Sequence, residues 1–126
     1  MKPPKRDQRL LSSRQFRIVY DRGRKFSTPF FSAFFLLTND GRQRMGLTTT
    51  RKIGGAVLRN RCRRRLREVF RLRNQASLDG VSFDLVLNVK PTAASADYQE
   101  IEASFSQTLL RFRHSIEKAK PSEKLG

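Results

Sequence analysis

The amino-acid sequence predicts an α+β fold, a single-sheet α/β sandwich in which helices pack on one β-sheet. Three features predict it: apolar segments of strand length, apolar residues at helical spacing, and turn signals between these segments. The predicted order is helix, strand, strand, basic helix, strand, helix, with an optional further strand before the basic helix (α-β-β-(β)-α-β-α). The 126 residues suffice for one hydrophobic core but hardly for two. We expect a flexible basic tail at 1–9, one folded domain at 10–117 and a disordered tail at 118–126.

The first predicted helix spans about 12–22. Ser12 and Gln15 have the spacing of a capping box, which satisfies backbone amides at a helix start. Gly23 suits a left-handed C-terminal cap. The apolar residues of this helix share one face: Phe16, Val19 and Tyr20.

Two strands are predicted next. The first, at 29–38, is apolar at nearly every position, so both of its faces must be covered, and Phe34 lies on one of them. The sequence Asn39-Asp40-Gly41 is a strong turn signal. It predicts a hairpin into a second strand at about 44–50.

The basic helix is predicted at about 56–73. From Arg51 to Arg73 the chain has ten Lys or Arg and a single acid, Glu68. Like charges at this spacing destabilise a free helix, but beside a polyanion each phosphate contact releases counterions. One side of the helix forms an apolar stripe: Leu58, Cys62, Leu66, Val69 and Phe70. The other side is polar and basic: Asn60, Arg64, Arg67 and Arg71, with Arg61 and Arg63 beside them.

After the basic helix the chain returns to a strand and then to a helix. At 82–89, apolar residues of one face alternate with residues of the other, and Pro91 ends the strand. The last helix is predicted at about 96–117. It has one apolar side: Tyr98, Ile101, Phe105, Leu109, Phe112 and Ile116.

The overall charge indicates a nucleic-acid partner. Lys and Arg number 27 against 11 Asp and Glu, so the formal net charge is +16 and the pI about 11.5. Such a balance favours binding to nucleic acid or another polyanion. A membrane is disfavoured, because no apolar run approaches the ~20 residues of a spanning helix. With a single cysteine and no apolar run of a signal peptide near the N-terminus, a cytoplasmic location is expected.

The sequence offers few groups for catalysis. The one histidine, His114, falls late on the final helix, where we expect a surface position. Cys62 falls on the apolar stripe of the basic helix, where a thiol is not activated. The acids are scattered singly and lack metal-ligand spacing. We therefore predict no catalytic residue and no metal ligand in this chain.

The segment 52–68 resembles the protein subunit of bacterial ribonuclease P. That family carries a Lys-x-Gly-Asn-Ala-Val-x-Arg-Asn-Arg pattern followed by further basic residues. The resemblance covers roughly residues 10–113, and one departure is Gly55, where the family usually has Asn. The residues that carry the motif are Lys52, Gly54, Ala56, Val57, Arg59, Asn60, Arg61, Arg63, Arg64, Arg65 and Arg67.

The resemblance implies a division of labour. An RNA molecule with its Mg²⁺ ions cleaves precursor tRNA to form the mature 5′ end, and the protein binds that RNA and the single-stranded 5′ leader. The implied partners are the catalytic RNA subunit and precursor tRNA, and neither DNA nor a membrane. The resemblance also implies a left-handed crossover from the second strand through the basic helix to the third, although such units are nearly always right-handed.

The residue pattern supports the same expectation, because basic helices follow RNA backbones and aromatic rings stack on bases. We expect a leader-binding cleft formed by Phe16, Tyr20 and Phe34, with ordinary core packing as the alternative for these rings. The expected basic rim of the cleft is Lys52, Arg59 and Arg63. The expected contacts to the catalytic RNA are Lys52, Arg59, Asn60, Arg61, Arg63, Arg64, Arg65, Arg67 and Arg71.

Three other functions remain open at this point. A structural RNA-binding protein of the ribosomal type would share the charge and the basic helix but not the aromatic cleft. A basic-region DNA-binding factor would need a heptad zipper or a helix-turn-helix beside the basic helix, and residues 74–95 supply neither. A nuclease acting alone would need convergent acids, bases or metal ligands.

Overall fold

The computed structural model describes residue 9 and residues 12–125, with side chains described for all of these except 73–77 and 119–125. Within this part of the chain, three α-helices, four strands and two short 3-10 turns confirm the predicted α+β fold, and the optional strand is present. In chain order the elements are α1 (Ser13–Arg22), β1 (Arg24–Ser27), β2 (Phe31–Leu37), β3 (Gln43–Thr48), η2 (Arg51–Ile53), α2 (Ala56–Ser77), β4 (Phe83–Val89), η3 (Pro91–Ala94) and α3 (Tyr98–Leu125).

The strands form one sheet in the order β1-β2-β4-β3. β2 is antiparallel to β1 and β4, whereas β3 pairs with β4 in parallel. The predicted hairpin between β2 and β3 is therefore wrong, although the chain does turn at Gly41, whose φ is 76°. β4 lies between the two because its first five residues, Phe83 to Leu87, are all buried. Only a central strand has both of its faces covered to that extent.

β1 is the strand whose position the sequence does not reveal. Its residues are largely exposed, and it lies at one edge of the sheet. It pairs with the segment Ser32–Phe35 of β2. A short, polar edge strand lacks the alternation of apolar residues by which a strand is predicted from sequence. β1 is therefore identified only by its pairing with β2.

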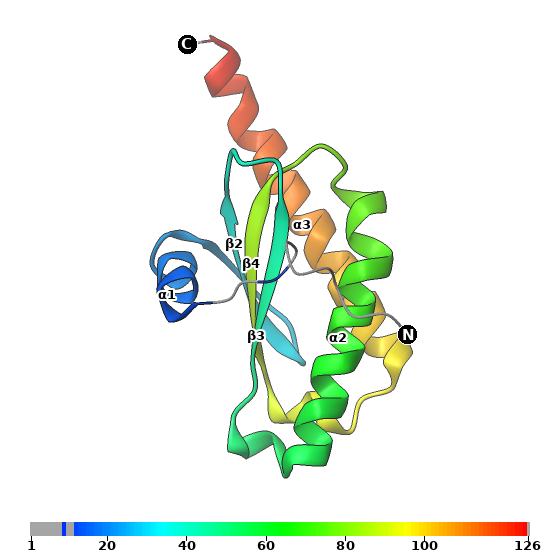
Figure 1. Ribbon diagram of the computed structural model, residues 1–126. Coiled ribbons are helices and arrows are strands. Elements are labelled where there is room, and N and C mark those ends of the chain that lie inside the picture. The colour runs from blue at the N-terminus through cyan, green and yellow to red at the C-terminus, as the bar shows by residue number, and fades with distance from the viewer. Residues whose placement is uncertain (1–8, 10–11, 126) are drawn as a thin grey trace.

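The main core lies between the sheet and the helices α2 and α3, whereas α1 rests on the opposite face (Figure 1). Phe35 of β2 stacks on Phe112 of α3, with ring centroids 4.1 Å apart. Leu58 lies outside this core at 36% exposure, because it packs against Gly54 where the helix begins. The rest of the predicted apolar stripe is confirmed as buried: Cys62, Leu66, Val69 and Phe70.

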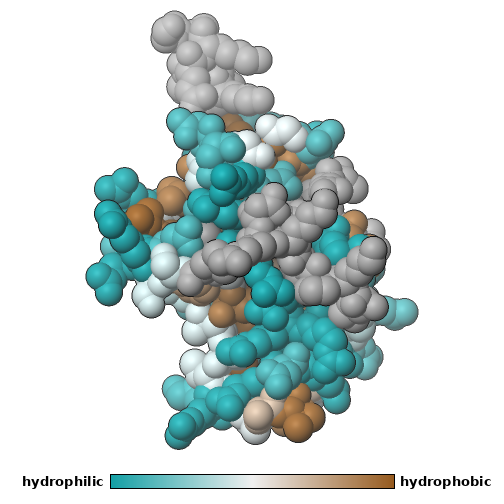
Figure 2. All heavy atoms as spheres, viewed as in Figure 1, coloured by the Kyte–Doolittle hydropathy of each residue, from teal (hydrophilic) through white to brown (hydrophobic). Residues whose placement is uncertain are grey.

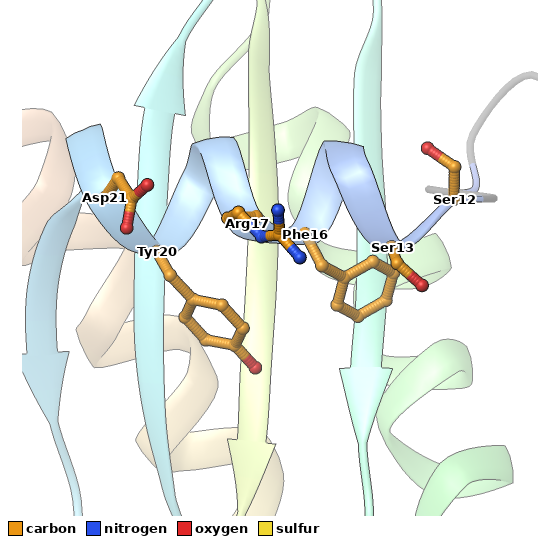
Figure 3. Close-up of a pocket in the computed structure, with 6 residues that line it drawn as sticks. All are labelled: Ser12, Ser13, Phe16, Arg17, Tyr20 and Asp21. Carbon is orange, nitrogen blue, oxygen red and sulfur yellow. The ribbon is translucent and has the colours of Figure 1, made fainter.

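The crossover from β3 through α2 to β4 is left-handed. Seen from the α1 side, β3 and β4 both run downward with β3 on the right, and α2 lies behind the sheet (Figure 3). With the strands turned to point up and the helix toward the viewer, β4 lies to the left of β3. The usual unit has the opposite hand, so the structure agrees with the family resemblance and not with the general rule.

The two ends of α1 are formed differently from each other. At the start, the predicted capping box is confirmed. The backbone N–H of Gln15 donates to Ser12 Oγ at 3.2 Å, and the backbone N–H of Ser12 donates to Gln15 Oε1 at 3.1 Å. At the end, the predicted left-handed cap is wrong, because Gly23 has extended angles of φ −76° and ψ 160°. A Cβ there would lie 2.5 Å from the carbonyl oxygen of Val19 and 3.0 Å from that of Phe35. Glycine is needed for this close approach of α1 to β2.

The last helix, α3, is longer than predicted. α3 continues to Leu125, past the predicted end at residue 117 and through the segment for which the sequence predicts a disordered tail. The residues after 117 include Lys, Ala and Glu, which favour helix, so the helix continues after its apolar side ends. The tail predicted at 1–9 lies outside the described residues, apart from Arg9.

Candidate nucleic-acid interface

The surface of α2 carries its polar side chains at two levels of exposure, and hydrophilic residues cover most of the described face in view (Figure 2). The exposed polar side chains of its middle part are, as predicted, Asn60, Arg61 and Arg64. Three half-buried arginines follow one another at intervals of four residues and form a stripe along one flank of the helix, here called the flank stripe: Arg59, Arg63 and Arg67.

Arg67 therefore differs from the prediction, which placed it on the side opposite the core. Burial lowers the pKa of its guanidinium, and the positive charges of Arg9 and Arg63 lower it further. The polar side of α2 is therefore narrower than a helical wheel suggests.

Two of the predicted RNA-binding arginines are engaged within the protein. Arg65 donates to the carbonyl oxygen of Ala96 at 3.0 Å. Arg71 pairs with Glu68 at 2.6 Å, and this hydrogen bond raises the pKa of Arg71. Both guanidiniums contribute positive charge, but they have fewer donors left for a phosphate than an unbonded arginine has.

Lys52 lies exposed in η2, the turn that connects β3 to α2. β3 ends at Thr48 and α2 begins at Ala56, so Lys52 stands near the same end of the sheet as the first turn of α2. Arg59 follows on that first turn. The structure thus places the predicted basic rim along the connection between the sheet and the basic helix.

Two of the residues that hold α1 on its face of the sheet are Val19 and Phe16. Val19 is fully buried and packs against Val86 near the middle of β4. Phe16 lies over Gly46 of β3, where a Cβ would stand 2.3 Å from Phe16 Cζ. Any side chain at position 46 would push this ring away from the sheet. No local sequence pattern indicates that role for Gly46.

Tyr20 and Phe34 contact each other beneath α1. Their ring centroids are 5.0 Å apart and the rings meet edge to face at 84°. The ammonium group of Lys25, on β1, lies 5.7 Å from the centre of the Phe34 ring. The Tyr20 hydroxyl donates to Asn88 Oδ1 and is bonded to Thr48 Oγ1 at 3.0 Å. Lys25 is a cation of this region that was not predicted, because the sequence does not reveal the position of β1.

A groove of about 530 Å³ runs along α1 beside these rings (Figure 3). The three predicted aromatic residues lie on one side of the sheet, and each is half-buried. Phe16 and Tyr20 line the groove, whereas Phe34 lies beneath Tyr20. The lining residues are Ser12, Ser13, Phe16, Arg17, Tyr20 and Asp21.

A row of polar side chains crosses the sheet next to the rings, here called the polar row. The strand register aligns Ser27 with Ser32, Ser32 with Asn88, and Asn88 with Thr48. Lys90 extends it at one end, with Nζ 3.1 Å from Ser27 Oγ. Strands in a sheet are about 4.8 Å apart, so the row spans roughly 14 Å. The alternation of residues along a strand predicts which of them lie on this face. That they lie side by side across the sheet follows only from the strand register.

The groups that could support catalysis are dispersed. His114 is exposed and Cys62 is buried, as predicted, and burial raises the pKa of the Cys62 thiol. Asp84 accepts two hydrogen bonds from Arg44, at 2.9 and 3.0 Å. In the part of the chain that the structure describes, no three His, Cys, Asp or Glu side chains come together in a way that would hold a metal ion.

None of the helices in the described residues combines the length and the apolar character that crossing a bilayer requires.

Known proteins share both the sequence pattern and the fold. The sequence pattern of the Ribonuclease P family matches residues 5–113. A "Ribonuclease P protein component" of Natranaerobius thermophilus is 35% identical over 91 residues, which cover 72% of this chain and 77% of that protein. The RNase P protein of Thermotoga maritima has a TM-score of 0.72 at 26% identity, and the match covers 82% of this chain and 96% of that one. The RNase P protein of Staphylococcus aureus has the same fold, with a TM-score of 0.73 at 21% identity over 84% of this chain and 94% of that one. Since the family pattern extends over most of the sequence, the chain belongs to the ribonuclease P protein family.

Proposed function

We propose that this protein is the subunit of ribonuclease P that assists a catalytic RNA in removing the 5′ leader from precursor tRNA. The observation that carries the proposal is the position of β3 between two surfaces. Gly46 and Thr48 of β3 face α1 and its groove, and η2 then leads directly into the cationic helix α2. One protein surface can therefore hold a structured RNA while the adjoining one holds a single strand.

Binding to the catalytic RNA is assigned to α2. Its exposed residues Arg61 and Arg64, together with the flank stripe, form the densest group of cations on a regular element of the described chain, and the exposed Asn60 lies beside them. Lys52 extends this surface from η2. Arginines on a rigid helix can contact successive phosphates of an RNA backbone, and each such contact releases counterions.

Binding of the 5′ leader is assigned to the groove beside α1 and to the sheet next to it. Phe16 and Tyr20 offer ring surface to bases, which stack without regard to sequence. The polar row offers hydroxyl and amide groups for ribose and phosphate. Lys25, Lys52 and the flank stripe supply charge around this surface. Leaders of different sequence would be bound by the same contacts.

The phosphodiester chemistry is assigned to the RNA subunit and its Mg²⁺ ions. The acids of the described chain do not converge, and Asp84 and Glu68 are each bonded to an arginine, so this set of donors does not fit a magnesium site of the protein. The protein would act by binding and orienting the substrate in the cytoplasm. Cleavage by the RNA would supply the chemical step.

The leader-binding role is tested with the reconstituted holoenzyme and two ligands, precursor tRNA with a leader of several nucleotides and mature tRNA. We expect Tyr20→Ala to weaken binding of the precursor by about fivefold or more, since stacking contributes about 1–3 kcal/mol per base. Phe34→Ala should weaken it as well, because the Phe34 ring supports that of Tyr20. Affinity for mature tRNA should change little. Tyr98→Ala, a half-buried tyrosine on α3 at the other face, is the matched control and should leave the ratio of the two affinities unchanged. Equal losses for both ligands would return these rings to a purely structural role.

The role of α2 is tested by the salt dependence of binding to the catalytic RNA. Arg61→Ala and Arg64→Ala should each weaken binding and flatten the slope of log K against log salt by roughly 0.7–0.9, the value for one lost phosphate contact. Combining Arg61→Ala, Arg64→Ala and Arg67→Ala should flatten it further. An unchanged slope in the triple variant would show that this side of α2 is only solvated.

A further inference from the structure

A small polar cavity lies beside β1, at the edge of the sheet opposite to β3. It has a volume of about 250 Å³ and lies between the segment 27–29, where β1 turns into β2, and one flank of α3. None of the residues that line it is an acid, and none of them belongs to α2 or to the groove beside α1. The α3 residues that line it follow one another at helical spacing: Ser104, Gln107, Thr108 and Arg111.

The cavity presents polar groups that the protein itself does not use. In the described part of the chain, the hydroxyl of Ser104 and the side chain of Gln107 make no hydrogen bond. Thr108 is 1% exposed, and its hydroxyl donates to the carbonyl oxygen of Ser104 at 2.7 Å, so the hydroxyl oxygen can still accept. Thr28, by contrast, uses its hydroxyl within the turn, where it accepts from the backbone N–H of Phe31 at 3.0 Å and fixes the wall of the cavity. A polar ligand therefore binds here without the loss of a contact within the protein.

Arg111 supplies the positive charge of this cavity. Its guanidinium carbon lies 5.2 Å from the centre of the Phe26 ring, and Nη1 donates to the carbonyl oxygen of Ser27 at 3.3 Å. These two contacts position the guanidinium, while most of its five N–H donors stay available. Among the described residues no carboxylate pairs with Arg111. The carboxylate of Glu100, about three helical turns earlier on the same flank, accepts from the backbone N–H of Asp97 at 3.0 Å. An anionic group is therefore attracted to the Arg111 end of the cavity.

Ser27 connects this cavity with the polar row. Its Oγ, which belongs to the polar row, lies 3.4 Å from Ser32 Oγ, and its carbonyl oxygen accepts from Arg111. β1 is an edge strand, so no described strand pairs with its outer edge. A single strand of RNA that follows the polar row can pass around this edge and reach the cavity. The other end of the row, at Thr48, adjoins η2 and α2, so the cavity lies at the end away from the basic helix.

We propose that this cavity holds one ribose-phosphate unit of the precursor tRNA leader, beyond the part of the leader that lies on the polar row. The inference rests on the proposed function, in which α2 binds the catalytic RNA and so lies near the cleaved bond. The leader then runs from Thr48 towards Ser27, and its distal nucleotides reach β1. Arg111 binds the phosphate, and Ser104 and Gln107 bind the ribose hydroxyls, which both donate and accept. The volume is below the roughly 300–1,000 Å³ of sites for drug-sized ligands, and no aromatic ring lines the cavity, so it suits a sugar and a phosphate rather than a stacked base.

The first test measures how affinity depends on leader length. The reconstituted holoenzyme is titrated with precursor tRNAs whose leaders lengthen by one nucleotide at a time. With the unaltered protein, affinity should rise again once the leader is long enough to reach the cavity. Arg111→Gln should weaken binding of these long leaders by about tenfold and Gln107→Ala by about threefold, the values for a charged and a neutral hydrogen bond. Affinity for short leaders should change little in either variant.

The choice of variants separates this effect from a folding defect. Gln107→Ala removes no hydrogen bond of the described protein. Arg113→Gln, the matched control on the same helix, alters an exposed arginine that lies outside the cavity and pairs with Glu117 at 3.2 Å. This control should keep the full dependence on leader length. Length profiles of Arg111→Gln and Gln107→Ala that run parallel to that of the unaltered protein would overturn the proposal.

The second test locates the leader in the holoenzyme directly. An iron chelate that generates hydroxyl radicals is attached to Ala103→Cys, an exposed position one helical turn before Gln107 and outside the cavity lining. Cys62 is 2% exposed and does not compete for the reagent. The label should cleave leader nucleotides farther from the tRNA than those cleaved from a label on Arg14→Cys, at the start of α1. Cleavage of the catalytic RNA in place of the leader, or of neither RNA, would show that the leader does not reach the cavity and that the proposal is wrong.

The two tests distinguish failure of this site from failure of the function on which it rests. If the affinity of the unaltered holoenzyme does not depend on the leader at any length, the proposed leader binding fails as a whole. If short leaders already raise the affinity, and Arg111→Gln and Gln107→Ala leave the length profile unaltered, only the assignment of the cavity is wrong.

Discussion

Replacing Gly46 with alanine should displace α1 from the sheet. The new Cβ would stand 2.3 Å from Phe16 Cζ and 2.8 and 2.9 Å from its two Cε atoms. Carbon atoms in contact prefer a separation of about 3.5–4.0 Å, so the ring has to move by roughly 1 Å or more. β3 cannot yield as readily, because it is hydrogen-bonded to β4 along its length. The ring therefore moves toward the groove that it lines.

The expected loss of stability is about 1–3 kcal/mol, the usual cost of inserting a methyl group where no space exists. Removing a glycine from a strand works in the opposite direction by roughly 0.5–1 kcal/mol, so we expect the lower part of that range. The main core between the sheet and the helices α2 and α3 does not involve Gly46 or Phe16. The variant should consequently fold, with α1 as the altered element.

Urea unfolding followed by circular dichroism measures this loss through the shift of the midpoint. The Phe16→Ala background provides the control, because removing the ring removes the obstacle. In that background Gly46→Ala should cost nothing or stabilise slightly, so that the two substitutions couple by about 1–3 kcal/mol. An equal loss in both backgrounds would show that the ring does not exclude a side chain at position 46, and would refute the contact as the determinant of where α1 lies.

Two further predictions concern the sheet and the start of α2. Asp84→Ala should destabilise the protein by about 3 kcal/mol, as measured by urea unfolding. Asp84 is 7% exposed, and its removal takes away two hydrogen bonds of Arg44. A loss below roughly 0.5 kcal/mol would mean that solvent replaces these two hydrogen bonds. Gly55→Asn should stabilise by a few tenths of a kcal/mol, because the Gly55 carbonyl accepts the first helical hydrogen bond from Arg59 at 3.1 Å and asparagine caps helices better than glycine. A clear loss of stability in Gly55→Asn would contradict that capping role.

Features that depend on local spacing could be predicted from the sequence alone. The capping box at Ser12, the buried stripe of α2 from Cys62 to Phe70 and the strand Phe83–Val89 follow from the periodicity of neighbouring residues. The concentration of cations on α2 is a property of composition and does not need the fold. For the same reason the sequence motif sufficed to indicate the family.

Which segments meet became apparent only in the folded structure. β4 lies between β2 and β3, so the apparent hairpin does not form, and β1 is defined only by its pairing with β2. The fit of Phe16 over Gly46, the alignment of the polar row and the bridge between Arg9 and Met45 all join residues far apart in the chain. Such contacts depend on strand order and register, which result from burying both faces of the central strands at once. The spacing of residues within a single segment does not reveal strand order or register.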